Sequence, residues 1–186
     1  MHVNLSLCKG GQNLFKTSPN HSQRAESFLQ GILDKAAELS VFLNPIPNSY
    51  SRLGQMGAPK RVSWSHQSRS QLVRIPASKE ENNRMELRSP DPACNPYLAF
   101  ALLIHAGLDG VEQHSRLMPS GKENAQTLPK NLGEAIVLAE KSEFLKRVLP
   151  PRLLSAFLEQ KQREWEERQK VSNPHQFDLE TYFDRI

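Results

Sequence analysis

One short segment places three charged side chains at alternate positions, Arg84, Glu86 and Arg88. Successive side chains of a strand point to opposite faces, so in a strand Met85 and Leu87 would share one face and the charges the other. The simplest interpretation of a carboxylate between two arginines is a salt-bridged sheet surface. The alternative is that Glu86 binds a divalent cation, a hard ion that prefers carboxylate oxygens, while the arginines hold anionic groups beside it.

Other residues extend this pattern. His2 shares one face of a predicted opening strand with Asn4 and Ser6, although a lone histidine is more often structural than a metal ligand. Further arginines stand singly around the next predicted strands, and each alone is a common surface residue. Because arginine holds carboxylate or phosphate in a planar two-toothed contact, several spaced arginines indicate a ligand with more than one anionic group. These arginines are Arg52, Arg69 and Arg74.

The elements expected to position these residues change in type along the chain. Alternating or short apolar runs predict strands, and amphipathic patterns with cap residues predict helices. Strands come first and helices dominate the second half, which is an α+β order. The Asn95-Pro96 helix, nearly all apolar until Asp109-Gly110 ends it, is predicted to be buried. The predicted strands are residues 1–7, 61–65, 71–76 and 84–89; the predicted helices are residues 22–43, 97–108, 131–140, one after Ser142, one from Pro151 and a last turn capped by Asp178.

Composition argues against several classes of protein. The 186 residues carry a formal net charge of +4, but the arginines are scattered, which favours small anionic ligands over nucleic acid. No apolar run approaches the roughly 18 residues of a membrane-spanning helix, so we expect a cytoplasmic protein without a membrane partner. Cys8 and Cys94 are isolated in the sequence, and neither a disulfide framework nor a zinc site is expected.

Ordered motifs in the first half of the chain resemble successive signatures of glutamine synthetase. The match is close to about Val111 and looser beyond it, where the chain is similar to the helical C-terminus of bacterial type I members. The resemblance implies that residues 1–112 form part of an α+β catalytic domain with antiparallel strands, and that residues 113–186 form the mainly helical C-terminal region of the same domain. The motifs are residues 1–6 (Met-His-Val-Asn-Leu-Ser), 48–53 (Asn-Ser-Tyr-Ser-Arg-Leu), 63–65 with 69–70 and 74–76, 84–92, and 95–98.

The resemblance implies an ATP-dependent glutamate–ammonia ligase that makes glutamine through a glutamyl phosphate intermediate. Magnesium or manganese would neutralise the triphosphate, and cationic side chains would hold the transferring phosphoryl group. By position in the motifs, His2 and Glu86 are implied metal ligands, and Arg69 is the implied catalytic contact. The implied glutamate-binding residues are Arg52, Arg69 and Arg88, and the implied ATP-binding residues are Asn4, Ser6, Arg69, Arg74 and Arg84.

The sequence also departs from the family pattern. Met1 stands inside the first motif, so we expect the N-terminal part of the enzyme, with the glutamates that complete both metal sites, to lie outside this chain. Asn4 replaces a usual histidine, and Gly57 stands where the family carries a loop glutamate that shields the intermediate. The chain alone is therefore predicted to be inactive, and its longer parent to form a homo-oligomer of the dodecamer type.

Three alternatives remain open. A non-catalytic glutamine synthetase-like binding or regulatory protein would keep the substrate arginines and lose the shielding glutamate. A family member that joins ammonia or an amine to another carboxylate would carry similar motifs, and the simplest alternative is a stable domain with no ligand. If part of the catalytic domain is missing, exposed apolar surface should remain, with marginal stability or self-association as the result.

Overall fold

The computed structural model describes residues 1–15, 22–55, 57–76, 82–121 and 126–183 of the chain. Two sets of strands lie in the first half, a four-stranded sheet and a separate hairpin. The sheet has the order β1-β6-β5-β4, and the hairpin joins β2 to β3. The sheet strands are β1 (Val3–Leu5), β4 (Trp64–Ser65), β5 (Val73–Arg74) and β6 (Met85–Leu87), and the hairpin strands are β2 (Cys8–Lys9) and β3 (Gln12–Asn13).

One strand pair departs from the prediction of antiparallel strands. β1 and β5 flank β6 and pair with it antiparallel, whereas β4 and β5 pair in parallel. Parallel neighbours usually need a crossover of a dozen or more residues. Residues 66–72 suffice here because each strand has only two residues, about 7 Å of chain, so the loop returns easily to the start of the next strand. The α+β class is confirmed, with a mixed sheet.

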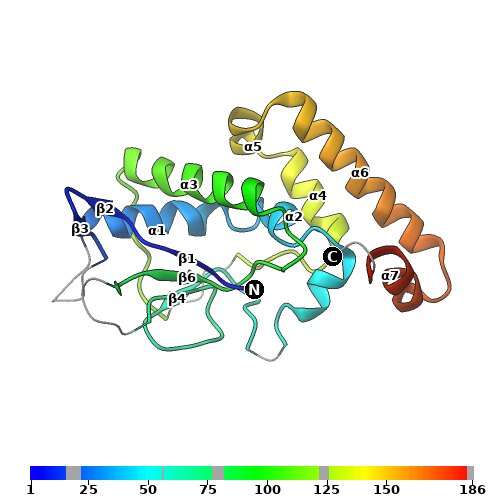
Figure 1. Cartoon of the computed structure of the whole chain (residues 1–186), viewed down its shortest axis with the longest axis horizontal. Helices are drawn as coiled ribbons and strands as arrows, with labels where there is room; N and C mark the ends of the chain where they lie inside the picture. The colour runs from blue at the N-terminus through cyan, green and yellow to red at the C-terminus, as the bar shows by residue number, and fades with distance from the viewer. Residues whose placement is uncertain (16–21, 56, 77–81, 122–125, 184–186) are drawn as a thin grey trace.

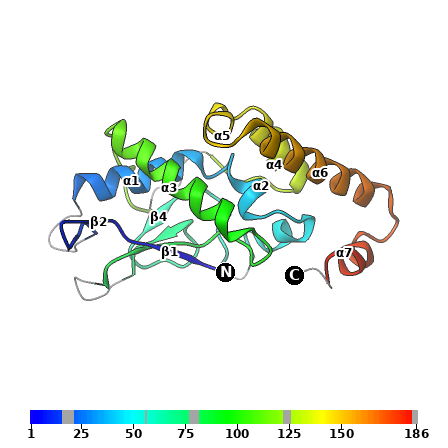
Figure 2. The ribbon, with the colours of Figure 1, turned by 45° about the horizontal axis from the view of Figure 1, so that its top comes forward.

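The helices form a second layer and a C-terminal group. In Figures 1 and 2, α1 and α3 lie along one side of the sheet, and α4, α5 and α6 lie beside them toward the C-terminus. Core residues from all these helices belong to one hydrophobic cluster. The helices are α1 (Gln23–Lys35), α2 (Ser40–Leu43), the 3-10 helix η1 (Pro47–Arg52), α3 (Pro96–Glu112), α4 (Leu132–Glu140), α5 (Glu143–Val148), α6 (Pro151–Lys170) and α7 (Pro174–Tyr182).

The single helix predicted over residues 22–43 is divided in two. The start near Ser22 is confirmed, because its side chain caps α1 and accepts a hydrogen bond from the Ala25 amide at 3.2 Å, but α1 ends at Lys35. Residues 39–47 are all buried, and a straight amphipathic helix buries only one face. The chain therefore changes direction before α2, which allows both segments to reach the core.

Two predictions about α3 are wrong. The helix does not end at Asp109-Gly110 but continues to Glu112, because Asp109 forms an ion pair with Arg147 and Gly110 packs against the backbone of α1. The helix is also not buried on all sides, since nothing in the described chain covers its outer face. That face exposes Tyr97, Phe100, Ile104 and Leu108.

Side-chain contacts attach the last two helices. The ring of Phe157 in α6 stacks on Phe42 in α2, with ring centroids 4.4 Å apart. The Arg168 guanidinium donates to both carboxylate oxygens of Asp178 in α7, at 2.8 and 3.0 Å. Asp178 thus lies inside α7 and Asn173 is its N-cap, so the predicted capping role of Asp178 is wrong. None of the described helices is long and apolar enough to cross a lipid bilayer.

Replacing Phe157 by alanine is expected to loosen α6 and α7 together. The loss of a half-buried ring and its stacking contact should cost about 2 kcal/mol of unfolding free energy, measured by urea denaturation. Leu153→Ala in the same helix, where the side chain is 38% exposed, is the matched control and should cost less than about 1 kcal/mol. An equal loss of unfolding free energy in the two variants would contradict the attachment of α6 to the core through Phe157.

Candidate functional site

A row of polar residues crosses one face of the sheet. The strand register places Ser65 opposite Arg74, Arg74 opposite Glu86, and Glu86 opposite Asn4. The alternation predicted for residues 84–88 is confirmed, because Met85 and Leu87 are buried in the core on the other face. A parallel apolar row on the core side consists of Trp64, Val73, Leu87 and Val3.

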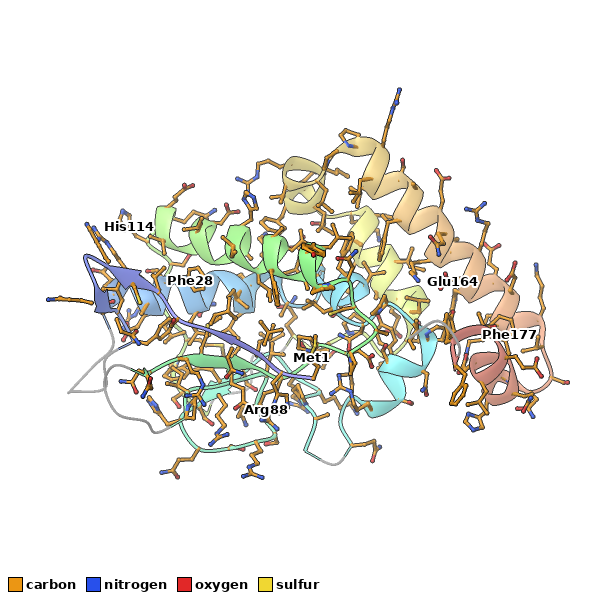
Figure 3. The ribbon with its side chains drawn as sticks, viewed as in Figure 1. Met1, Phe28, Arg88, His114, Glu164 and Phe177 are labelled. Atoms are coloured by element: carbon orange, nitrogen blue, oxygen red, sulfur yellow. The ribbon has the colours of Figure 1, made fainter. Side chains whose placement is uncertain are left out.

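Glu86 is the centre of the polar face. Its Oε1 accepts a hydrogen bond from Arg88 Nη1 at 2.9 Å and lies 2.6 Å from His2 Nδ1, and its Oε2 accepts from Arg74 Nη1 at 3.1 Å. Figure 3 shows Arg88 on the side of the sheet away from α1 and α3. These ion pairs bury Glu86 to 8% exposure, so the predicted exposed surface is instead a closed cluster. With two guanidinium groups around one carboxylate, the face keeps a positive surplus that attracts anions.

His2 is in the form that binds metals. Partial burial lowers its pKa most, the charge of Arg88 lowers it further, and the Glu86 carboxylate acts in the opposite direction. The imidazole is therefore neutral at neutral pH and donates its Nδ1 proton to Glu86, which leaves a lone pair on Nε2. Neutral imidazole is the ligating form of histidine.

His2 and Glu86 fit as two neighbouring ligands of a divalent cation, but not as a complete site. The two side chains are neighbours, since His2 Nδ1 and Glu86 Oε1 lie 2.6 Å apart in a hydrogen bond. The Nε2 lone pair of His2 and a carboxylate oxygen of Glu86 are both donor types that bind divalent cations. However, the residues that the structure describes contain no group of three or more histidine, cysteine, aspartate or glutamate side chains that could hold an ion.

Arg88 also fixes the loop that carries Arg69. Its Nε donates to the Arg69 carbonyl oxygen at 2.9 Å, while the Arg69 side chain is exposed in the loop between β4 and β5. The structure thus places Arg69 at the margin of the polar face rather than on Glu86. Alternation predicted that Arg88 shares a face with Glu86, but no signal in the sequence indicated that Arg88 holds this loop.

The other residues implied in ATP binding lie around the same face. Arg84 Nε donates to Asn4 Oδ1 at 3.0 Å, across the β1–β6 pair. Ser6 is exposed directly after β1. Together with Arg74, these residues line the face on both sides of Glu86. The structure therefore brings Asn4, Arg74 and Arg84 together on the polar face, with Ser6 just beyond the end of β1.

Arg52 lies at the end of η1, away from Glu86. Its Nη2 donates to the Ser89 carbonyl oxygen at 2.5 Å and lies 3.4 Å from Asn44 Oδ1. The guanidinium thereby ties η1 to the segment after β6. Its Nε is buried with no hydrogen-bond partner among the described residues.

Gly57 stands in an exposed turn. Its φ is +77°, a conformation that favours glycine, and a Cβ built there would meet no atom within 4 Å. The turn is closed by the Gly54 amide, which donates to the Ala58 carbonyl oxygen at 3.2 Å. The position supplies no carboxylate to the polar face.

Fold and site define an α+β domain whose sheet presents basic residues around one carboxylate, a surface suited to polyanionic ligands. Residues 1–182 match the family described as glutamine synthetase, catalytic domain. The chain belongs to the glutamine synthetase family, whose members are ligases, and the family resemblance of the motifs is confirmed.

Individual relatives agree with this assignment. The glutamine synthetase of Methanosarcina mazei is 41% identical over 193 residues, covering 94% of this chain and 43% of that protein. The enzyme of Thermus thermophilus is 37% identical, covering 98% and 44%. A solved structure described as a GmaS/ADP complex is 29% identical with a TM-score of 0.80, covering 98% of this chain and 45% of that one. The chain thus spans less than half the length of these relatives.

Proposed function

We propose that this chain supplies the substrate-binding sheet face of an ATP-dependent glutamate–ammonia ligase, which makes glutamine through a glutamyl phosphate intermediate. The observation that carries the proposal is the Glu86 carboxylate, 2.6 Å from His2 and ion-paired with Arg74 and Arg88. This cluster combines two potential metal ligands with cationic donors on one face. Membership of the glutamine synthetase family supports the assignment.

Glu86 organises the residues around it. Its two oxygens orient Arg74 and Arg88, and each guanidinium keeps further N–H donors for an anionic ligand. His2 and Glu86 would hold a magnesium or manganese ion, which when bound neutralises triphosphate charge. The remaining ligands of that ion, and those of a second ion, would come from protein outside this chain.

The peripheral arginines take the remaining roles. We assign the transferring phosphoryl group to Arg69, because its exposed guanidinium lies at the margin of the polar face on a loop that Arg88 holds. Arg52 would bind a glutamate carboxylate through the guanidinium N–H groups that its bonds to Ser89 and Asn44 leave free. Arg88 would also bind the glutamate substrate. ATP would be contacted by Asn4, Ser6, Arg74 and Arg84. Residues 113–186 would act as the helical support of residues 1–112.

The chain alone is proposed to be inactive, because the carboxylates that complete the metal sites are not among its described residues. Activity would then belong to a longer cytoplasmic protein or to a complex, as a homo-oligomer of the dodecamer type. An ammonia-dependent reaction is the first candidate, since the curated relatives of this chain are glutamine synthetases.

The full chain incubated with ATP, magnesium, glutamate and ammonia is expected to form no glutamine above the protein-free rate, measured by chromatography. It should still bind ATP, and Arg74→Met should weaken that binding about tenfold, the effect of losing one charged hydrogen bond. Lys146→Met, at an exposed ion pair on α5, is the matched control and should leave ATP binding unchanged. Glutamine formation by the chain alone would overturn the claim that metal ligands are missing from it. ATP binding that Arg74→Met leaves unchanged would overturn the assignment of the polar face to ATP.

A non-catalytic binding or regulatory protein is the second candidate. Asn4 and Gly57 favour it, because neither residue supplies the second histidine or the shielding glutamate that the family carries there. An assay that combines this chain with the missing part of the catalytic domain separates the two candidates. ATP binding without turnover in that complex would favour the second candidate.

A further inference from the structure

Buried polar atoms that lack a hydrogen bond are concentrated in one short segment. Of the five such side-chain atoms among the described residues, three belong to residues 44–52, namely Asn44 Nδ2, Ser49 Oγ and Arg52 Nε. Buried polar groups are normally hydrogen-bonded, because an unmade bond destabilises the folded state. A segment that contains three of them therefore indicates a role other than stability.

These three atoms belong to side chains that lie around one guanidinium group. In the 3-10 helix η1, side chains three residues apart stand on the same side, so Ser49 and Arg52 share one side. Asn44 Oδ1 lies 3.4 Å from Arg52 Nη2. Asn44 and Ser49 are 0% and 1% exposed, so together they place a buried amide and a buried hydroxyl beside Arg52.

Backbone and hydroxyl contacts hold Asn44 and Ser49 in place. The Asn44 amide N–H donates to the Ser40 carbonyl oxygen at 2.7 Å, directly after α2. Pro47 begins η1 with a restricted backbone, and the Tyr50 hydroxyl donates to the same Ser40 carbonyl at 3.4 Å. The position of both residues is thus set by α2 and does not depend on the Arg52 side chain.

The hydrogen bonds of Arg52 involve only one nitrogen of its guanidinium. Nη2 donates to the Ser89 carbonyl oxygen at 2.5 Å and lies 3.4 Å from both the Pro90 carbonyl oxygen and Asn44 Oδ1. Nε is buried, and Nη1 forms no hydrogen bond with the residues that the structure describes. Nη1 is therefore the nitrogen that remains for a ligand.

We propose that Asn44 and Ser49 are positioning residues for Arg52, which hold the Nε and Nη2 side of its guanidinium and leave Nη1 for a substrate carboxylate. The inference rests on the proposed function, in which Arg52 binds glutamate. A charged guanidinium needs polar neighbours where it is buried, so apolar side chains would not serve. A neutral amide also leaves the positive charge of Arg52 to the substrate, whereas a carboxylate would compensate it.

The test follows the Arg52 Nε–H signal of the full ¹⁵N-labelled chain by NMR, assigned through its loss in Arg52→Lys. Exchange of this hydrogen with water is expected to be slow, and Asn44→Ala should speed it at least about tenfold, because the guanidinium leaves its buried position. Titration with glutamate on the same sample gives the half-saturating concentration. That concentration should rise about tenfold in Asn44→Ala, the effect of losing one charged hydrogen bond to a misplaced arginine.

Asn44→Asp separates a positioning role from a purely structural one. The new carboxylate would hold the guanidinium, so exchange at Nε should stay slow, but its charge would compete with glutamate and weaken glutamate binding more than about tenfold. A purely structural role predicts faster exchange in both Asn44 variants. Ser49→Ala, which changes less volume, should speed exchange about threefold and provides the same test if Asn44→Ala does not fold.

Asn48→Ala is the matched control. Asn48 is exposed on the same η1 helix, where its Oδ1 accepts from the Ser51 hydroxyl at 3.1 Å, and its loss should leave exchange and glutamate binding unchanged. Exchange at Nε that neither Asn44→Ala nor Ser49→Ala speeds, or that Asn48→Ala speeds equally, would overturn the positioning role.

The two readouts also separate this inference from the proposed function. Glutamate binding of equal strength in the unmodified chain and in Asn44→Ala would overturn the positioning role and leave the glutamate role of Arg52 intact. No glutamate binding by the unmodified chain, with exchange at Nε responding as expected, would overturn that glutamate role and leave the positioning of Arg52 intact.

Discussion

Alanine at Glu86 is expected to lower the free energy of unfolding by about 3–5 kcal/mol, the cost of removing one partner from a buried ion-pair cluster. The variant would leave the guanidinium groups of Arg74 and Arg88 facing each other without the shared carboxylate. Their side chains are only 26% and 10% exposed, so water compensates little. Urea denaturation followed by circular dichroism measures the change.

The exposed pair between Glu143 and Lys146 provides the matched control. These side chains are 86% and 49% exposed, and Glu143→Ala should cost less than about 1 kcal/mol. Glu86→Gln, which keeps the volume and one acceptor, should fall between the two. If Glu86→Ala lowers the free energy of unfolding no more than Glu143→Ala does, the Glu86 cluster does not stabilise the sheet. The cluster would then serve ligand binding alone.

Gly110→Ala is expected to destabilise the chain by about 3 kcal/mol, the upper range for forcing an extra carbon into a packed core. A Cβ at this position would lie 2.1 Å from the Ser27 carbonyl oxygen and 2.7 Å from the Gly31 amide nitrogen. Both obstacles are backbone atoms of α1, so the clash is relieved only by separating the helices. Gly31→Ala, with a Cβ 2.2 Å from the Ala106 carbonyl oxygen, should have a comparable effect.

Whether Gly110→Ala lowers or raises the free energy of unfolding distinguishes a close crossing of α1 and α3 from an open one. In an open helix, glycine to alanine stabilises by about 1 kcal/mol. Ala101→Gly on the exposed face of α3 sets that scale in the same helix and should cost about 1 kcal/mol. A stabilising Gly110→Ala would contradict the close crossing of α1 and α3.

The local pattern of residue types in the sequence predicted much of the arrangement of the polar face. The alternation of residues 84–88 placed Glu86 opposite Met85 and Leu87, because side-chain direction in a strand depends only on position along it. The order of the motifs likewise identified the glutamine synthetase family, since each motif is a contiguous run of residues. The helix predicted from residue 131 likewise follows from local chemistry, since the Asn131 side chain caps α4.

Tertiary structure alone decided what surrounds those residues. The ion pair between Glu86 and Arg74 of the neighbouring strand, the bond from Arg88 to the Arg69 carbonyl, and the parallel pairing of β4 with β5 all join segments that are separate in the sequence. The break between α1 and α2, and the uncovered face of α3, depend on how much neighbouring protein is available for packing. The sequence shows that α3 is apolar over most of its length, but only the assembled layers show that its outer face has no cover in the described chain.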